Sequence, residues 1–355
     1  MKSWLITGGA GFIGSNFVRH ARAATTARLV IFDALTYAGN LATIADLIDN
    51  ERVQFVHGDI RDAAAVQDVF ERHDIDCVLH FAAESHVDRS IIGPQAFIET
   101  NVNGTLNLLA AARERWREAP ERRCFLHVST DEVYGTLSPT DPSFCETTAY
   151  APNSPYAASK AASDHLVRAW HHTYGLPALI TNCSNNYGPW QFPEKLIPLM
   201  ILNTVALREL PVYGDGLQVR DWLHVQDHCA ALLAVIERGV AGQTYCIGGD
   251  NQQRNLTVVE TICDLVDRQL GRRPGSARAL IRHVTDRPGH DRHYSIDYSK
   301  ARRELGWTPR HSFQTSLPDV VQWYLANPAW VDAIRSGEYM QFYERQYRHR
   351  LQATP

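Results

Sequence analysis

The 355-residue sequence has few sulfur-containing residues, with seven cysteines and three methionines. No two cysteines form a C-x-x-C pair, which excludes the common thiol-based zinc and redox motifs. Most of the cysteines lie within apolar segments, as Cys77 and Cys124 do. We interpret them as buried, reduced thiols, which predicts a cytoplasmic protein.

Long apolar runs and an excess of positive charge are also missing. No apolar run approaches the length of a membrane span, and no basic-then-apolar leader precedes the first expected strand. The 35 Lys and Arg residues are balanced by 39 Asp and Glu residues, which gives a net charge of −4. We therefore expect neither a membrane nor a nucleic-acid partner.

Histidine is plentiful, but its pattern does not predict a metal site. The sixteen histidines include His283, His290 and His293, which lie near Asp286 and Asp291. This segment is rich in Arg and Pro and reads as a loop without a helical His-x-x-x-His spacing. We interpret these side chains as solvated or ligand-facing, and we predict no bound metal.

A glycine-rich turn follows the first expected strand, residues 3–6. Gly9, Gly11 and Gly14 have the G-x-G-x-x-G spacing, and Gly8, Gly11 and Gly14 have a looser variant of it. Without a Cβ, the turn can form, approach a pyrophosphate and let the next helix pack closely on the strand. The pyrophosphate would then lie at the positive N-terminal end of that helix.

Asp33 ends the second expected strand, residues 29–32. It lies about 20 residues beyond the last glycine, where a carboxylate should bind the ribose hydroxyls of a dinucleotide. A carboxylate at this place would repel a 2′-phosphate. The sequence therefore predicts NAD rather than NADP as the cofactor.

Further apolar strands recur at the rhythm of a parallel sheet, at residues 53–56, 77–81, 123–128 and 178–181. Helical stretches such as 63–73 and 98–117 separate them, which indicates right-handed βαβ crossovers. The fold class predicted is α/β, a Rossmann-type doubly wound parallel sheet with a smaller α/β substrate-binding domain. Ligands bind such sheets at the carboxyl ends of the strands, which is where Asp59, Ala82, Ser85, Thr130 and Asn185 fall.

Tyr156 and Lys160 are the first candidate catalytic pair. Pro155 stands in the first turn of an expected helix, and residues four apart on a helix share one face. A tyrosine that acts as a base near neutral pH needs its pKa lowered by about three units, or roughly 4 kcal/mol. The Lys160 ammonium and a positive nicotinamide ring can together supply that stabilisation.

Thr130, Asp131 and Glu132 follow the expected strand 123–128 directly. Carboxylates after a strand are often only turn residues. Here, however, Thr130 would donate to the reacting oxygen, which brings Asp131 and Glu132 into the same pocket. An acid and a base side by side could remove a proton from one carbon and protonate a hydroxyl leaving the next, at a gain of about 10²–10⁴ in rate for each.

Several motifs together resemble one family over nearly the whole chain. They are AAESHVDRS at 82–90, STDEVYG at 129–135, SPYAASK at 154–160, FPEKLIP at 192–198, VRDW at 219–222 and DRPGHD at 286–291. The chain resembles the extended short-chain dehydrogenase/reductases, and within them the dTDP-glucose 4,6-dehydratases. The Thr-Asp-Glu triplet distinguishes this branch from the sugar-nucleotide epimerases, which lack the acid–base pair.

The resemblance implies a reaction and a role for each catalytic residue. Tyr156, oriented with Lys160, would take the proton of the sugar 4-hydroxyl while C4 gives its hydride to NAD, and Thr130 would bind the C4 oxygen. Glu132 would then take the C5 proton and Asp131 would protonate the departing 6-hydroxyl. Return of the hydride to C6 would yield dTDP-4-keto-6-deoxyglucose and water.

The remaining predicted site residues fall into two sets. For the cofactor we predict contacts from Gly8, Gly11, Phe12, Ile13, Gly14, Asp33, Thr36, Asp59, Ile60, Ala82, Ala83, Thr100, Tyr156, Lys160 and Asn186. For the nucleotide sugar, the resemblance adds to the Thr130–Glu132 triplet the residues Ser85, His86, Asn185, Lys195, Leu196, Tyr213, Arg220, Asn255, Arg287 and His290.

The predicted domains are residues 1–182 with 219–247 for NAD, and 183–218 with 248–355 for the nucleotide sugar. Aromatic residues near the C-terminus, among them Trp330 and Tyr339, read as packing of the second domain. The family pairs helices like those expected at 98–117 and 156–173 into a bundle, so a homodimer is predicted. Rival hypotheses are another nucleotide-sugar 4,6-dehydratase, a 4-epimerase or decarboxylase on the same scaffold, and a non-catalytic NAD-binding regulator.

Overall fold

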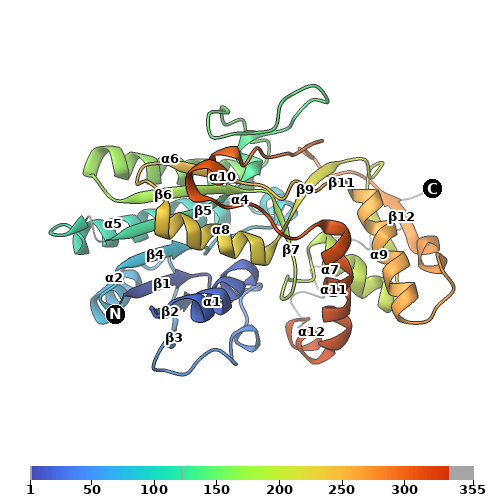
Figure 1. Ribbon diagram of the computed structural model, residues 1–355, viewed down its shortest axis with the longest axis horizontal. Helices are drawn as coiled ribbons and strands as arrows, with labels where there is room; N and C mark the ends of the chain where they lie inside the picture. The colour runs from blue at the N-terminus through green and yellow to red at the C-terminus, as the bar shows by residue number, and fades with distance from the viewer. Residues whose placement is uncertain (1, 121–122, 336–355) are drawn as a thin grey trace.

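A parallel seven-stranded sheet forms the centre of the computed structural model, which describes residues 2–120 and 123–335. The strand order is β10-β6-β5-β4-β1-β2-β3 (Figure 1). Successive strands are therefore added on one side of β1 up to β3 and on its other side from β4 onward. The predicted Rossmann-type sheet is confirmed. Its strands are β1 (Ser3–Thr7), β2 (Arg28–Asp33), β3 (Val53–His57), β4 (Cys77–His80), β5 (Cys124–Thr130), β6 (Ala178–Cys183) and β10 (Thr244–Ile247).

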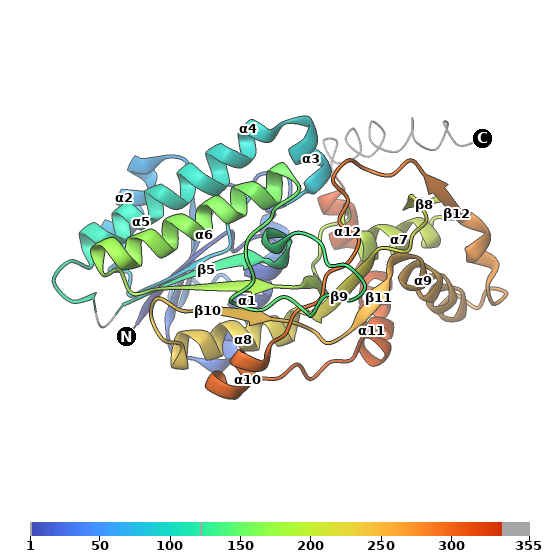
Figure 2. The same cartoon turned by 90° about the horizontal axis from the view of Figure 1, so that it is seen from above.

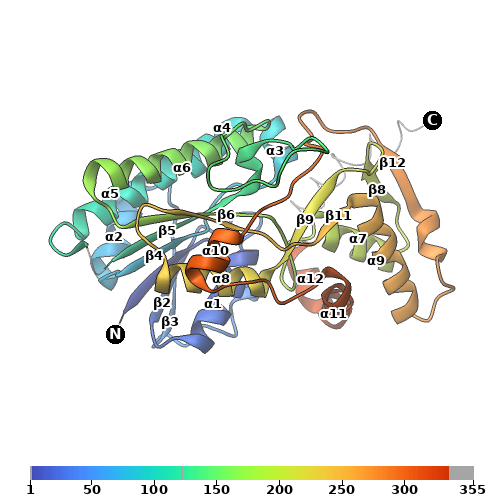
Figure 3. The ribbon, with the colours of Figure 1, turned by 45° about the horizontal axis from the view of Figure 1, so that its top comes forward.

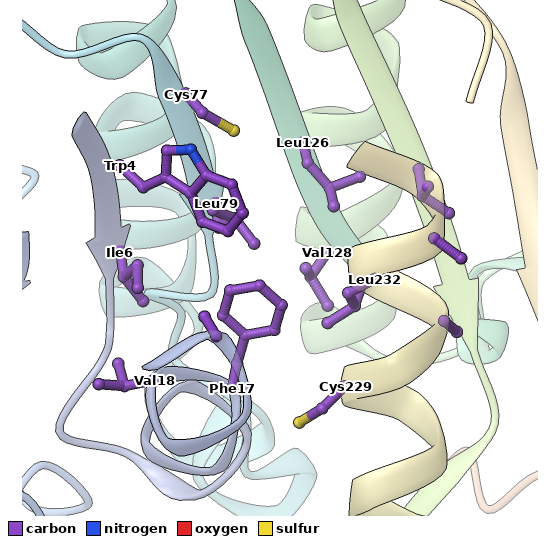
Figure 4. Packing of buried hydrophobic residues seen from close by; sticks show 14 of the residues in the cluster. Trp4, Ile6, Phe17, Val18, Cys77, Leu79, Leu126, Val128, Cys229 and Leu232 are labelled. Atoms are coloured by element: carbon purple, nitrogen blue, oxygen red, sulfur yellow. The ribbon is translucent and has the colours of Figure 1, made fainter. Parts of the chain in front are cut away.

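Helices cover both faces of this sheet, as Figure 2 shows from above. On one face lie α1 (Phe12–Ala24), α8 (Val225–Arg238) and α10 (Ser299–Leu305); on the other lie α2 (Ala63–His73), α5 (Thr105–Arg115) and α6 (Pro155–Tyr174). Neighbouring residues of β1 point to opposite faces. Trp4 and Ile6 therefore pack with Phe17 of α1 (Figure 4), whereas Leu5 packs with the apolar residues of α2 and α5.

Helices α2 and α6 begin at capping residues, and α6 ends at a glycine, as such residues in the sequence indicate. Asp62 Oδ1 accepts hydrogen bonds from the backbone N–H groups of residues 64 and 65 and so caps α2. Ser154 caps α6 in the same way, Pro155 occupies its first turn, and Gly175 ends it with a left-handed φ of 69°. These caps fix the direction in which α6 enters the site.

One expected helix, 98–117, has two parts. Residues Ile98–Gly104 form a π-helical segment, η2, and α5 continues only to Arg115. The wider turn places Asn101 so that its side chain bonds both the N–H and the C=O of Glu84, at 2.9 and 3.0 Å. Hydrophobic periodicity cannot separate a single π segment from an α-helix, which is why the sequence predicts one continuous helix.

The second part of the molecule lies beyond the carboxyl ends of the large sheet (Figure 3). It contains a three-stranded sheet of β7 (Asn185–Tyr187), β9 (Val219–His224) and β11 (Gln252–Arg254), and a pair formed by β8 (Leu210–Tyr213) and β12 (Ile281–Val284). The helices α7 (Leu196–Val205), α9 (Asn255–Gln269), α11 (Phe313–Ala326) and α12 (Pro328–Ile334) pack around a separate apolar core. Of the shorter helices, η5 (Ser276–Leu280) follows α9. The others come between the strands of the large sheet in the sequence: η1 (Leu41–Thr43), α3 (Val87–Ile92), α4 (Pro94–Phe97) and η4 (Asp131–Tyr134).

Two segments pack across the predicted domain boundaries. β9 pairs with β7 and β11 rather than with the large sheet, while α10 and Trp307 pack into the core formed with α8. Trp330 lies in the second core, and its Nε1 donates to Thr43 Oγ1 at 3.1 Å. Tyr339 lies outside the described residues, as does the predicted end of the second domain. Within the described part of the chain, every helix is too short or too polar to cross a membrane.

Candidate active site

The turn between β1 and α1 is built so closely that only glycine fits at two positions. Gly8 has φ +69°, and a Cβ there would lie 2.6 Å from the backbone nitrogen of Ala82. A Cβ on Gly14 would lie 2.3 Å from the carbonyl oxygen of Gly8. The turn therefore leads directly into the N-terminus of α1, whose unpaired N–H groups face an anion-binding position.

An elongated cavity opens at the carboxyl ends of β1, β2, β4, β5 and β6. All the residues predicted to contact the cofactor line it: Gly8, Gly11, Phe12, Ile13, Gly14, Asp33, Thr36, Asp59, Ile60, Ala82, Ala83, Thr100, Tyr156, Lys160 and Asn186. Glycines and alanines are among the residues of this wall, and their small side chains leave room for backbone N–H groups to reach a ligand. The glycine turn, a strand-ending carboxylate and this shape fit a dinucleotide.

Asp33 is held in place by the backbone around it. Its Oδ2 accepts from the N–H of Ala10 at 2.9 Å, and its Oδ1 accepts from the N–H of Leu35 at 2.8 Å. Burial raises the pKa of Asp33, while these two hydrogen bonds lower it. Each carboxylate oxygen keeps a second lone pair, so the residue can still accept from the two hydroxyls of a ribose.

The residues predicted for the substrate divide into those that line the cavity and those that do not. Ser85, Thr130, Glu132, Asn185 and Lys195 line it. The others lie outside its lining: His86, Asp131, Leu196, Tyr213, Arg220, Asn255, Arg287 and His290. Sequence spacing alone does not distinguish the two groups, since both come from the same loops and strand ends.

Many of the charged residues beyond the cavity are held by partners from the protein itself. Arg220 donates to the carbonyls of Val219 and Asp291, both at 2.8 Å, and its guanidinium lies 4.2 Å from the centre of the Tyr294 ring. Arg287 lies 3.9 Å from a carboxylate oxygen of Asp88. The positive charges of Arg287 and Arg220 both act on Glu132, where they oppose the rise in its pKa that burial causes.

His290 and Tyr213 are likewise held by hydrogen bonds to carboxylates. His290 Nδ1 lies 2.5 Å from Asp286 Oδ1, and the Tyr213 hydroxyl donates to Asp88 Oδ2 at 3.0 Å. Lys195, in the cavity wall, donates from Nζ to the carbonyl of Ser85 at 2.7 Å. A negatively charged ligand entering here would meet several cations that are already positioned.

Tyr156 and Lys160 project from the first turns of α6 into the cavity. Burial, followed by the charge of Glu132, raises the pKa of Tyr156 well above its ordinary value, and a hydrogen bond with Thr130 lowers it. Lys160 Nζ donates to the carbonyl of Val128 at 2.9 Å, and burial lowers its pKa to about 8.

The sequence argument expected the tyrosine pKa to be lowered, and the protein alone produces a rise. The cause is that desolvation and the Glu132 charge both favour the neutral phenol. Lys160 is engaged with the Val128 carbonyl and is not among the main influences on Tyr156. A positively charged cofactor in the cavity would act in the opposite direction and favour the phenolate.

The Thr130–Glu132 triplet lies where β5 passes into η4. The Thr130 side chain accepts from the N–H of Glu132 at 3.3 Å and donates to Asp131 Oδ1 at 3.4 Å. Asp131 is 1 % exposed, and its Oδ2 has no hydrogen-bond partner within the ranges that the structure describes. A buried carboxyl oxygen without a hydrogen-bond partner disfavours the charged form and so favours the protonated acid.

The two carboxyl groups of the triplet have different surroundings. Burial raises the pKa of both, but next in importance for Asp131 are the carboxylates of Glu132 and Asp221, which raise its pKa further. For Glu132, Arg287, Arg220 and Lys195 act against the rise. Glu132 therefore ionises first and suits a base, whereas Asp131 keeps its proton and suits an acid.

Several residues that line the cavity were assigned no role from the sequence: Glu84, Cys183, Ser184, Gln191, Phe192 and Glu194. Cys183 ends β6 and Ser184 follows it, so the rule that places ligands at strand ends could have found both. Glu194 belongs to the quoted FPEKLIP motif. Its carboxylate lies 3.3 Å from Arg89 Nε, a contact between residues far apart in the sequence that no local pattern predicts.

Fold and site together define a dinucleotide-binding enzyme with a Tyr-x-x-x-Lys pair and an adjacent acid–base pair. The chain belongs to the GDP-mannose 4,6-dehydratase family, whose model matches residues 5–320.

Relatives with known names agree with this assignment. The dTDP-glucose 4,6-dehydratase of Xanthomonas campestris pv. campestris strain B100 is 58 % identical over 344 residues, which is 96 % of this chain and 97 % of that protein. The enzyme of the same name from Shigella flexneri is 55 % identical, over 98 % of this chain and 99 % of that protein. Among solved structures, the dTDP-glucose 4,6-dehydratase DesIV of Streptomyces venezuelae, with NAD and TYD bound, has a TM-score of 0.86 and 45 % identity, and the match covers 94 % of this chain and 99 % of that one.

Proposed function

We propose that this protein is an NAD-dependent dTDP-glucose 4,6-dehydratase, which converts dTDP-D-glucose to dTDP-4-keto-6-deoxy-D-glucose and water. The observation that carries the proposal is the pair Asp131 and Glu132 beside Tyr156, with surroundings that favour a proton on the first and a charge on the second. The relatives that share more than half of their residues with this chain carry the same enzyme name.

Each catalytic side chain has one task in this reaction. Tyr156 takes the proton of the sugar 4-hydroxyl, and Thr130, which lines the same cavity, holds the C4 oxygen. The residues that line the cavity would hold NAD, which when bound would supply an acceptor for the C4 hydride and a donor for its return to C6. Glu132 removes the proton from C5, which a C4 ketone has made acidic, and Asp131 gives its proton to the 6-hydroxyl as water leaves. The proton on Glu132 then returns to C5.

The nucleotide is proposed to bind at the cationic end of the site. Arg220 and Arg287 have planar guanidinium groups, which match the oxygens of a diphosphate better than an ammonium would. Lys195 adds a third positive charge on the cavity wall. The sugar would then lie between these cations and Tyr156.

A substrate labelled with deuterium at C4 tests the proposal. We expect the product to carry that deuterium at C6, as measured by proton NMR of the isolated nucleotide sugar. Label that stays at C4 would instead indicate a 4-epimerase, a function carried out by a structural neighbour from Thermus thermophilus at 26 % identity and a TM-score of 0.80. Absence of turnover with dTDP-, UDP- and GDP-sugars would favour a non-catalytic regulator.

Asp131→Asn separates elimination from oxidation. The amide cannot donate a proton in place of the acid, so loss of the 6-hydroxyl should slow by about 10²–10⁴ while oxidation at C4 continues. Reduced cofactor should then accumulate on the enzyme and be visible by its absorbance. Turnover equal to that of the unaltered protein would remove Asp131 from the mechanism.

We further propose a homodimer in the cytoplasm. The helices α5 and α6 lie side by side on the outside of the sheet (Figure 2), and Ile92, Ile98 and Leu106 nearby are 73, 47 and 37 % exposed. All seven cysteines are free thiols, which suits a reducing compartment. Light scattering of the purified protein tests the dimer, and Leu106→Glu should shift it toward the monomer.

A further inference from the structure

A buried carboxylate lies behind the catalytic lysine and has no task in the reaction described above. Asp164 follows Lys160 by one turn of α6, so the two side chains share a helix face. The residue is 1 % exposed and does not line the cavity. A charge in such a dry position is costly unless hydrogen bonds and an opposite charge stabilise it.

Neutral groups from three segments donate to one oxygen of this carboxylate. Asp164 Oδ2 accepts from Ser129 Oγ at 2.9 Å, from the Tyr150 hydroxyl at 2.9 Å and from Asn182 Nδ2 at 3.2 Å. Hydroxyl and amide donors favour the ionised form without cancelling its charge. The negative charge of Asp164 is thus available to act on its surroundings.

The cation that faces this charge is Lys160. His127 Nε2 lies 3.4 Å from Lys160 Nζ and 3.2 Å from Asp164 Oδ1, so the imidazole stands between the two groups. Burial lowers the pKa of His127 to about 4, which leaves the ring neutral near pH 7. Lys160 itself is 4 % exposed, and its ammonium donates a hydrogen bond to the backbone carbonyl of Val128.

We propose that Asp164 is a positioning residue whose negative charge keeps the buried Lys160 ammonium ionised beside Tyr156. The proposal rests on the proposed function for the task of Lys160 in the reaction. It goes further in assigning the source of that charge to one residue outside the cavity. The hydrogen bond that Asp164 accepts from Asn182 has a second consequence, because Asn182 Nδ2 also donates to the carbonyl of Thr130 at 3.1 Å. The same carboxylate thereby anchors the start of the catalytic triplet.

Other titratable groups around this centre do not change charge in the relevant pH range. Burial lowers the pKa of His80, whose ring lies 5.1 Å from that of His127, and burial raises the pKa of Cys183 to about 12. Burial also raises the pKa values of Tyr150 and Tyr134, which reach Asp164 directly or through Asn182. Among the groups packed around Asp164 and named here, Lys160 is therefore the one expected to titrate between about pH 6 and pH 9.

The small number of lysines allows a direct test. The chain contains four, Lys2, Lys160, Lys195 and Lys300, so a protein labelled with carbon-13 at the lysine ε-carbon gives few NMR signals. The variant Lys160→Met identifies the signal of interest. In the NAD-loaded protein we expect Lys160 to titrate below the ordinary lysine value, as burial lowers its pKa, and in Asp164→Asn at least about one pH unit lower still, because the amide keeps its shape but loses the charge.

Tyr150→Phe is the matched control. It removes one of the hydrogen bonds to Asp164 and leaves the carboxylate charged. Lys160 should titrate in this variant within a few tenths of a pH unit of the unaltered protein. An unchanged titration in Asp164→Asn, or an equal shift in both variants, would refute the assignment to charge.

The pH profile of turnover gives a second readout. The ammonium is present below the pKa of Lys160 and is lost as the pH rises through it. A pKa one unit lower therefore reduces kcat of Asp164→Asn about fivefold near pH 8 and hardly at all near pH 6. KM for the nucleotide sugar should stay the same, because Asp164 does not line the cavity. A merely structural defect would lower kcat at every pH.

Two outcomes keep the proposals separate. If the unaltered protein does not turn over dTDP-glucose, the proposed function fails, while the NMR titration still measures the influence of Asp164. If Asp164→Asn does not fold, the titration of Lys160 in the unaltered protein still tests the proposal. A buried lysine without a nearby anion titrates at about 5–6, so a Lys160 signal in that range would contradict the proposal.

Discussion

The two ends of the cavity differ in the residues that form their walls. At the cofactor end, glycine and alanine residues bring the backbone to the cavity wall, with gaps too small for a single added carbon at Gly8 and Gly14. At the substrate end, charged side chains such as Glu132 and Lys195 form the wall, and arginines stand behind them. One end recognises its ligand by close approach and the other by charge.

This difference predicts how each end responds to change. Steric fit in a close-packed turn fails abruptly, because the neighbouring atoms are backbone and cannot move aside. Electrostatic recognition is shared among several cations and weakens in steps. Substitutions at the cofactor end should therefore act on the presence of the cofactor, and those at the substrate end on the rates and on KM.

The largest effect is expected for Gly14→Ala. The new Cβ would lie 2.3 Å from the carbonyl oxygen of Gly8, so the turn must open at a cost of about 3 kcal/mol or more, which is a factor of over 100 in affinity. The purified variant should contain no NAD by chromatography of the released nucleotide. Gly93→Ala is the control, since its nearest neighbour would be 4.0 Å away. Retention of NAD by Gly14→Ala would mean that close approach does not govern this end.

Glu132→Gln should have the next largest effect. The amide cannot take the C5 proton, so kcat should fall by about 10²–10⁴. NAD content should be unchanged, because charge at the substrate end is not what holds the cofactor. Glu51→Gln, an exposed residue, serves as the control for loss of a carboxylate. A variant that loses NAD together with its activity would blur the distinction between the two ends.

How far the sequence predicts the site depends on the same distinction. The glycine spacing and Asp33 are local patterns, and the residues derived from them line one cavity. The strand ends Thr130 and Asn185 follow from the alternation of strands and helices. These features are visible because they belong to single segments of chain.

Other features arise only from contacts between distant segments. The rise in the pKa of Tyr156 depends on its burial and on the nearness of Glu132. Neither can be predicted from the spacing of residues along the sequence. Asp164 gains its hydrogen bonds from residues 14 to 35 positions away along the chain. The π segment at 98–104 accompanies the side-chain bonds of Asn101 to Glu84, which lies 17 positions away along the chain. Sequence patterns thus predict which residues reach the site more readily than what charge they carry there.

Arg220→Lys should produce a smaller, graded effect. Two nitrogens of the guanidinium are engaged by the carbonyls of Val219 and Asp291, and an ammonium cannot make both bonds and still face a diphosphate. We expect KM for dTDP-glucose to rise about tenfold, or 1.4 kcal/mol, with kcat changed much less. Arg292→Lys alters an exposed pair with Asp215 and should leave KM unchanged. Equal rises in both variants would mean that net charge alone, and not the guanidinium of Arg220, binds the nucleotide.

The smallest effect is expected for Asp33→Asn, which tests charge at the end governed by shape. Loss of the carboxylate removes its repulsion of a 2′-phosphate, so the ratio of the Kd for NADP to that for NAD should fall about fivefold, or roughly 1 kcal/mol. One Asn atom is an N–H donor facing the N–H of Ala10 or Leu35, so stability should also fall by about 1–3 kcal/mol. Asp49→Asn is the matched control, because Asp49 Oδ1 likewise accepts from backbone N–H groups but lies away from the cavity. It should lose stability and leave the ratio unchanged. A fall in the ratio as large as 100-fold would show that charge governs the cofactor end as well, and the contrast between the two ends would then be one of degree.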